Sequence, residues 1–199
     1  MYKKCILPAL FSLGIMLTAS GQSDIKMTTK GSFDDKVLRE LLSFNDMDFY
    51  NVKMEGKLAG HHFTIVSKEI WNGKLKKVDT LFNSKQYEMF RIASDTLRFS
   101  AISGKTSNRN LKVRFSFDRF SIARNYKSSK SDAYSLRDFG TQLPISVGKP
   151  FYAFAYILPT RHADGSSSWC EVEASGDDIE NWGKKFNIEH YILFEMKFE

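Results

Sequence analysis

Cysteine is scarce in this sequence of 199 residues, which contains only Cys5 and Cys170. Small secreted domains that depend on disulfides carry several cysteines, so this chain does not belong to that class. The four histidines lack the spacing of a zinc site, and the adjacent pair His61 and His62 would face opposite sides of a strand. We therefore expect no metal site.

The sequence also lacks the short motifs of nucleotide and cofactor chemistry. It contains no glycine-rich phosphate loop, no dinucleotide-binding glycine pattern, no serine elbow and no calcium-binding loop. No nucleic-acid-binding motif accompanies the formal net charge of +6. We expect no cofactor and no nucleic-acid partner. An enzyme is not favoured, although a site assembled from loops would leave no local motif.

The first 21 residues have the pattern of a secretory signal peptide. Two lysines precede an apolar run over 5–17, which is too short to span a membrane comfortably and so disfavours a retained anchor. We expect cleavage after Gly21, which leaves 22–199 as a mature protein with one cysteine, Cys170, and no transmembrane segment. No cysteine follows the cleavage site, so we expect no lipid anchor. A mature chain that begins with Gln resembles exported proteins of Gram-negative gut bacteria, which implies a periplasmic or extracellular protein.

Proline is rare, and three of the four prolines border one stretch. Pro150 and Pro159 enclose residues 151–158, in which both alternate sets of side chains are apolar or aromatic. Successive side chains of a strand face opposite sides, so this stretch predicts a strand that is covered on both faces. Proline cannot donate to a sheet and is therefore typical of strand ends.

One helix is predicted over about residues 33–44, where Ser32 can cap the first turn and apolar residues form one stripe. We expect this stripe to pack across a sheet or close a barrel end. The remaining chain predicts nine or ten strands at roughly ten-residue intervals. Asn72-Gly73 indicates a tight hairpin, and a change of parity at 118–119 indicates a bulge or, less favoured, a tight turn. The fold class is therefore mainly β, a single-domain antiparallel sandwich of jelly-roll type.

Positive charge is concentrated between residues 105 and 130, where Asp118 is the only acid. A basic exposed face suits an anionic glycan, an anionic cell-envelope component or an acidic protein partner. The alternative is a solvated strand face that discourages edge pairing. The candidate ligand-binding residues are Arg109, Lys112, Arg114, Arg119, Arg124 and Lys127.

Residues 164–180 carry six acids and no lysine or arginine. Glu171 and Glu173 would point the same way from a strand predicted over 169–174, and paired carboxylates can act as acid and base on a glycosidic bond. A glycan-active hydrolase that uses carboxylates near Trp169 is therefore one alternative function. A structural or inhibitory protein with no small ligand is another.

Large aromatic side chains offer a further hypothesis, a platform on which sugar rings stack. Most such rings fill the core of a sandwich, so the platform would use only those that stay accessible. The patterns together favour an exported, non-catalytic binding module whose ligand is a glycan, a cell-envelope component or a protein. The platform candidates are Trp71, Trp169, Trp182, Tyr126, Tyr134 and Tyr152.

Overall fold

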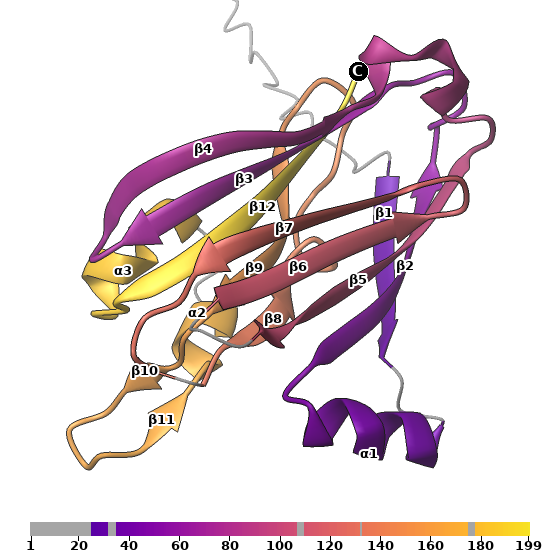
Figure 1. The fold of residues 1–199 in the computed structure, drawn as a ribbon. Helices are drawn as coiled ribbons and strands as arrows, with labels where there is room; N and C mark the ends of the chain where they lie inside the picture. The colour runs from indigo at the N-terminus through magenta and orange to yellow at the C-terminus, as the bar shows by residue number, and fades with distance from the viewer. Residues whose placement is uncertain (1–24, 32–34, 107–109, 132, 175–177) are drawn as a thin grey trace, which may run out of the picture.

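The protein is a sandwich of two five-stranded antiparallel sheets in a computed structural model (Figure 1). The structure describes residues 25–31, 35–106, 110–131, 133–174 and 178–199. The expected signal peptide lies outside these residues. The inner faces of the two sheets share one hydrophobic core, which confirms the prediction of a mainly β sandwich.

Sheet A comes from the first two thirds of the chain. Each neighbouring pair of its strands is antiparallel. Helix α1 (Lys36–Phe44) connects the first two strands of this sheet along the chain (Figure 1). The strands in spatial order are β1 (Ile25–Gly31), β2 (Asp48–Gly56), β5 (Thr96–Thr106), β6 (Asn110–Phe117) and β7 (Ser121–Lys127).

Sheet B joins segments that are far apart in the sequence. Its central strand, near the C-terminus, pairs with β3 on one side and β9 on the other. The hairpin between β3 and β4 turns at Asn72 and Gly73, whose φ angles are 49° and 67°, as their sequence predicts. The strands in spatial order are β4 (Lys74–Asn83), β3 (Phe63–Trp71), β12 (His190–Phe198), β9 (Phe151–Ile157) and β8 (Ser135–Asp138).

The alternation of apolar and polar residues decides which side chains enter the core. In β6, Val113 and Phe115 are buried, whereas Lys112 and Arg114 between and beside them are exposed. The ring of Phe115 lies 5.2 Å from that of Phe194 on β12, so the two sheets meet through aromatic contacts. The outer face of β6 therefore carries the cations Lys112 and Arg114.

Strand β9 is covered on both faces, as its sequence predicts. Phe154 and Tyr156 point into the main core, while Ala155 and Ile157 belong to a second core on the other side of sheet B. Trp182, fully buried, is the largest side chain of this second core. The segment that covers it contains β10 (Thr160–Arg161), β11 (Ser167–Ser168), α2 (Cys170–Ala174), η3 (Ile179–Asn181) and α3 (Trp182–Lys185).

Helix α1 (Lys36–Phe44) confirms the predicted helix but not its predicted packing. Asp35 caps it, accepting a hydrogen bond from the Leu38 N–H at 3.0 Å. None of its residues is buried, and Val37 and Phe44 are 76% and 88% exposed. The expectation that the apolar stripe packs across a sheet or closes a barrel end is wrong, because the helix lies beyond the end of β2 (Figure 1). No helix of the described residues is long and apolar enough to cross a membrane.

Several local expectations differ from the structure. Two short helices, η1 (Ser84–Gln86) and η2 (Glu88–Phe90), lie between β4 and β5. Strands β6 and β7 are joined by a tight turn rather than the favoured bulge, because the Phe117 N–H donates to the Phe120 carbonyl at 2.8 Å. The strand expected over 169–174 is mostly α2.

Candidate anion-binding face

Lys112 and Arg114 lie on the outer face of sheet A, as their strand parity predicts. Lys112 is paired between Gly104 of β5 and Asn125 of β7, and Arg114 is paired between Ile102 of β5 and Ala123 of β7. Their small or uncharged neighbours leave both side chains exposed. The pair therefore projects into solvent from the middle of a five-stranded sheet.

Strand pairing adds cations that the sequence analysis did not connect with this face. Lys53 of β2 is directly opposite Arg98 of β5. Lys26 and Lys30 alternate with buried residues of β1 and are exposed on the same side. The alternation within each strand indicates that these lysines and Arg98 face outward. Only the pairing between strands shows that they lie on the same surface. We call the outer surface of sheet A the basic face; its cations are Lys26, Lys30, Lys53, Arg98, Lys112, Arg114 and Lys127.

A row of small polar side chains crosses the middle of the basic face. The pairing places Asn51, Ser100, Ser116 and Ser121 side by side on β2, β5, β6 and β7. None of these four side chains hydrogen-bonds to another described residue, so their donors and acceptors remain available to water or a ligand. We call these residues the polar row.

The negative charge on the basic face is small. Glu55 forms an ion pair with Lys53 and is the one acid among the outward residues of the described strands of sheet A. Within the described part of the chain, Arg98, Lys112 and Arg114 form no ion pair. Unpaired cations on one surface produce a positive potential that attracts anionic ligands.

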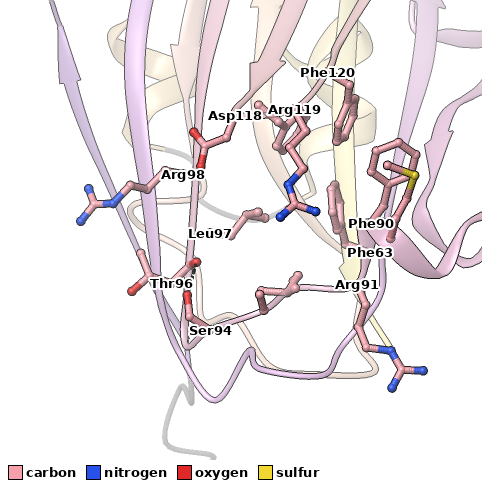
Figure 2. Close-up of a pocket in the computed structure, with 14 residues that line it drawn as sticks. Phe63, Phe90, Arg91, Ser94, Thr96, Leu97, Arg98, Asp118, Arg119 and Phe120 are labelled. Carbon is pink, nitrogen blue, oxygen red and sulfur yellow. Dashed lines mark hydrogen bonds between the residues drawn. The ribbon is translucent and has the colours of Figure 1, made fainter.

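A pocket of about 210 Å³ opens at the end of the sandwich, next to the basic face. Arg98 and Asp118 line both this pocket and a neighbouring hollow that includes Asn51, Ser100 and Ser116, so the pocket and the polar row are continuous. Figure 2 shows the Arg119 side chain extended across the pocket towards Leu97. Arg119 is therefore a further cation at the end of the basic face.

Phenylalanine rings form the apolar wall of this pocket. The ring of Phe120 lies 4.6 Å from Phe90 and 4.7 Å from Phe117, and Figure 2 shows Phe63, Phe90 and Phe120 along one side. Arg91 extends away and is paired with Glu88 at 2.7 Å, whereas Arg119 has no ion pair with any described residue. The pocket can accept an apolar group while Arg119 binds an anionic one.

The remaining candidate cations do not all join the basic face. Arg124 of β7 extends towards β4, where its Nε lies 3.6 Å from Asp79 Oδ2, so it links the two sheets at one edge of the sandwich. Lys127 ends β7 and is exposed opposite Asn110. Arg109 lies outside the described residues.

Lys68 on the outer face of sheet B differs from these cations, because it is paired with two acids. Lys68 Nζ lies 2.7 Å from Glu180 Oε1 and 2.8 Å from Glu195 Oε2, and it also donates to the Tyr152 hydroxyl. These contacts tie η3 to the sheet. Hydrogen bonds from Lys68 and Tyr152 lower the pKa of Glu180. The charge of Lys68 is therefore compensated, whereas Arg98, Lys112 and Arg114 of sheet A have no ion pair with any described residue.

The carboxylates expected to act on a glycosidic bond do not share a strand face. Positions 171 and 173 both fall on α2, so the alternating strand on which the expectation rested is not formed. The Glu171 carboxylate accepts a hydrogen bond from Ser168 at 3.0 Å and lies 3.4 Å from His162 Nε2. Ser168 also contacts Nε2, so the acid does not hold the opposite ring nitrogen as in a serine-histidine-acid triad. Cys170 begins the same helix and is exposed and free.

His190 is the most buried of the four histidines. No group of metal-ligating side chains converges among the described residues. His190 is fully buried between the sheets, where its Nδ1 lies 2.6 Å from the Tyr134 hydroxyl and its ring stacks on Trp71 at 3.9 Å. It occupies a core position, as its apolar neighbours in the sequence predict.

Comparison with protein-family models, with curated proteins and with solved structures finds no match to this chain. The function must therefore be argued from the arrangement of the residues.

Proposed function

We propose that this protein is an exported, non-catalytic binding module that holds an acidic glycan of the cell envelope on its basic face. The observation that carries the proposal is the group of unpaired cations on the outer face of sheet A, Arg98, Lys112 and Arg114, set against the paired Lys68 on sheet B. Guanidinium and ammonium groups bind carboxylate, sulfate and phosphate groups, which are the charged groups of acidic glycans.

The polar row favours a glycan over a protein partner. Asn51, Ser100 and Ser116 offer short hydrogen-bonding side chains at the level of the sheet, with the cations on either side. Sugar hydroxyls both donate and accept hydrogen bonds, and hydroxyl and amide side chains can match both roles. Protein interfaces usually place aromatic or large apolar residues at their centre, and this row has none.

Export supports the same ligand class. The first 21 residues have the pattern of a signal peptide, which would deliver the protein to a compartment that contains envelope polysaccharides. The hydrolase alternative is less favoured, because Glu171 is engaged with Ser168 and His162.

The proposal predicts retention on sulfated and carboxylated polysaccharides. The purified protein should bind immobilised heparin and polygalacturonate, and binding should weaken as salt screens the charges. The double charge reversal Lys112→Glu with Arg114→Glu should reduce affinity at least about tenfold, equivalent to about 1.4 kcal/mol. Calorimetry or column elution at several salt concentrations measures both effects.

A matched control reverses two exposed lysines elsewhere. Lys184 and Lys185 lie on α3, outside sheet B, and changing both to Glu alters the net charge by the same amount. This variant should retain most of the affinity. Equal losses in the two variants would show that binding follows net charge alone and would contradict a site on the basic face.

A further inference from the structure

A second pocket lies at the other end of the sandwich. Strand β2 runs from Asp48, which is paired with Ser103, to Glu55, which is paired with Thr96 beside the phenylalanine-lined pocket. The second pocket has a volume of about 430 Å³ and is lined from the β2 end by Asp48 and Tyr50. It is therefore separated from the first pocket by the length of a strand. We call it the α1 pocket, because Arg39 of α1 forms part of its lining.

Four aromatic residues line the α1 pocket, and the three that carry a polar atom, all but Phe49, have that atom held by the protein. The Tyr50 hydroxyl donates to the Leu136 carbonyl at 3.0 Å, and Trp169 Nε1 donates to the Ile157 carbonyl at 3.3 Å. The Tyr134 hydroxyl is held between the Ser129 N–H and the buried His190. The rings are thus fixed before any ligand arrives, which reduces the entropy lost on binding.

Trp169 is supported on one side by a cation. The Arg137 guanidinium lies 5.3 Å from the centre of the Trp169 ring, within the range of a cation–π contact. Two of the aromatic residues that the sequence analysis considered for sugar stacking, Tyr134 and Trp169, line this one pocket, although 35 positions separate them in the sequence.

Asp48 supplies a carboxylate with an acceptor to spare. Its Oδ2 accepts hydrogen bonds from the Leu136 N–H at 2.7 Å and from Ser103 at 3.0 Å. Its Oδ1 has one long contact, 3.4 Å from the Ser135 hydroxyl. Burial raises the pKa of Asp48, although these hydrogen bonds partly oppose the effect. An oxygen with so few partners can accept a hydrogen bond from a ligand hydroxyl.

The charge of the α1 pocket differs from that of the basic face. Its charged lining residues are Arg39, Asp46 and Asp48, which sum to a net negative charge when both acids are ionised. With Arg137 beside Trp169 the charges around the pocket balance, so the pocket lacks the excess of cations that favours an acidic glycan. A ligand without negative charge, with one face for aromatic contact and hydroxyls at its edge, fits the lining.

From this arrangement we infer that the α1 pocket binds a neutral sugar residue, with Tyr50, Tyr134 and Trp169 contacting the ring and Asp48 accepting its hydroxyl. This site is independent of the basic face, since the two lie at different places on sheet A and suit ligands of different charge. A protein with both sites would bind a glycan with acidic and neutral parts, or two separate chains.

Tryptophan fluorescence and calorimetry with neutral oligosaccharides test the inference. The probes are maltotetraose, cellotetraose and chitotetraose, added to the purified protein at high salt to suppress charge effects. At least one should give a saturable change. The variant Asp48→Asn, nearly identical in shape, should weaken that binding at least tenfold, and Trp169→Ala should abolish it.

The two proposals fail separately. Trp169→Ala and Asp48→Asn should retain heparin binding, and the Lys112→Glu with Arg114→Glu variant should retain neutral-sugar binding. Retained heparin binding also shows that each variant is folded. No binding of any neutral probe, or binding that is unchanged in both α1-pocket variants, would overturn the inference and leave the basic face unaffected.

Discussion

His190 shows how one buried residue can link the stability of this protein to pH. Its Nδ1 lies 2.6 Å from the Tyr134 hydroxyl, and its Nε2 lies 3.6 Å from the Glu69 carboxylate. Glu69 Oε1 already accepts a hydrogen bond from Trp71 at 2.6 Å. Burial lowers the pKa of His190 to about 3, despite the nearby acid, so the ring is neutral in the folded protein.

The lowered pKa predicts a loss of stability in acid. Below pH 6.5 the unfolded chain binds a proton at this histidine while the folded chain does not, so the free energy of unfolding falls as the pH drops from 6.5 towards 3. The slope from this residue is at most about 1.4 kcal/mol per pH unit. Urea unfolding at pH 7, 6, 5 and 4 should therefore show wild-type protein and His190→Gln converging in stability on acidification.

The core variant Phe194→Leu is the control for this effect, because it removes contacts without removing a titratable group. Its deficit relative to wild type should stay constant over the same pH range. A constant deficit for His190→Gln as well would show that His190 does not titrate differently in the folded and unfolded states.

At the scale of elements, α1 is the helix whose apolar stripe the fold leaves uncovered. Val37, Leu41 and Phe44 are each more than half exposed, and the opposite side of the helix, with Arg39 and Leu42, borders the α1 pocket. Large apolar side chains gathered on one exposed surface are uncommon in monomeric proteins. The exposure makes these side chains unimportant for the stability of the isolated fold.

Replacing this stripe should therefore cost little. The double variant Leu41→Ala with Phe44→Ala should change the free energy of unfolding by no more than about 0.5 kcal/mol, since surface substitutions rarely do more. The buried Phe194→Ala should lose about 3–5 kcal/mol. Chemical denaturation of the two variants makes the comparison. A loss of several kcal/mol from the helix variant would mean that the stripe packs against the protein.

The elements that the sequence predicts well are those with a strong local pattern. Strict alternation identifies β6, Asn72-Gly73 identifies the turn between β3 and β4, and the doubly apolar run identifies β9. Each signal depends on the segment itself. The alternation therefore predicts which side chains of β6 face the core, and it predicts that Lys112 and Arg114 are exposed.

The elements that were missed depend on partners distant in the sequence. Strand β1 has a polar sequence, but pairing with β2 covers Ile25 and Met27 and makes the strand stable. The same is true of the site. Alternation placed Lys53 on an outward face, but only the pairing of β2 with β5 places it opposite Arg98. The α1 pocket combines four segments, so no local pattern could predict it.

The whole molecule has two unlike outer faces. The C-terminal segment covers part of sheet B with a second apolar core, and ion pairs such as Lys68 with Glu180 compensate the charge beside it. Among the described residues no segment covers sheet A in this way, and Arg98, Lys112 and Arg114 on it have no ion pair. Because the strands of sheet A pair in register, the cations and the polar row form one continuous surface. The molecule therefore offers one face for an acidic ligand.

An NMR titration of the ¹⁵N-labelled protein with a heparin-derived hexasaccharide tests this account most directly. The account predicts that amide shifts concentrate on the outward residues of β5 and β6, among them Arg98, Ser100, Lys112 and Ser116, and that added salt reverses them. Shifts that concentrate instead on the outer face of sheet B, or the absence of shifts at low salt, would contradict the assignment of sheet A as the binding surface.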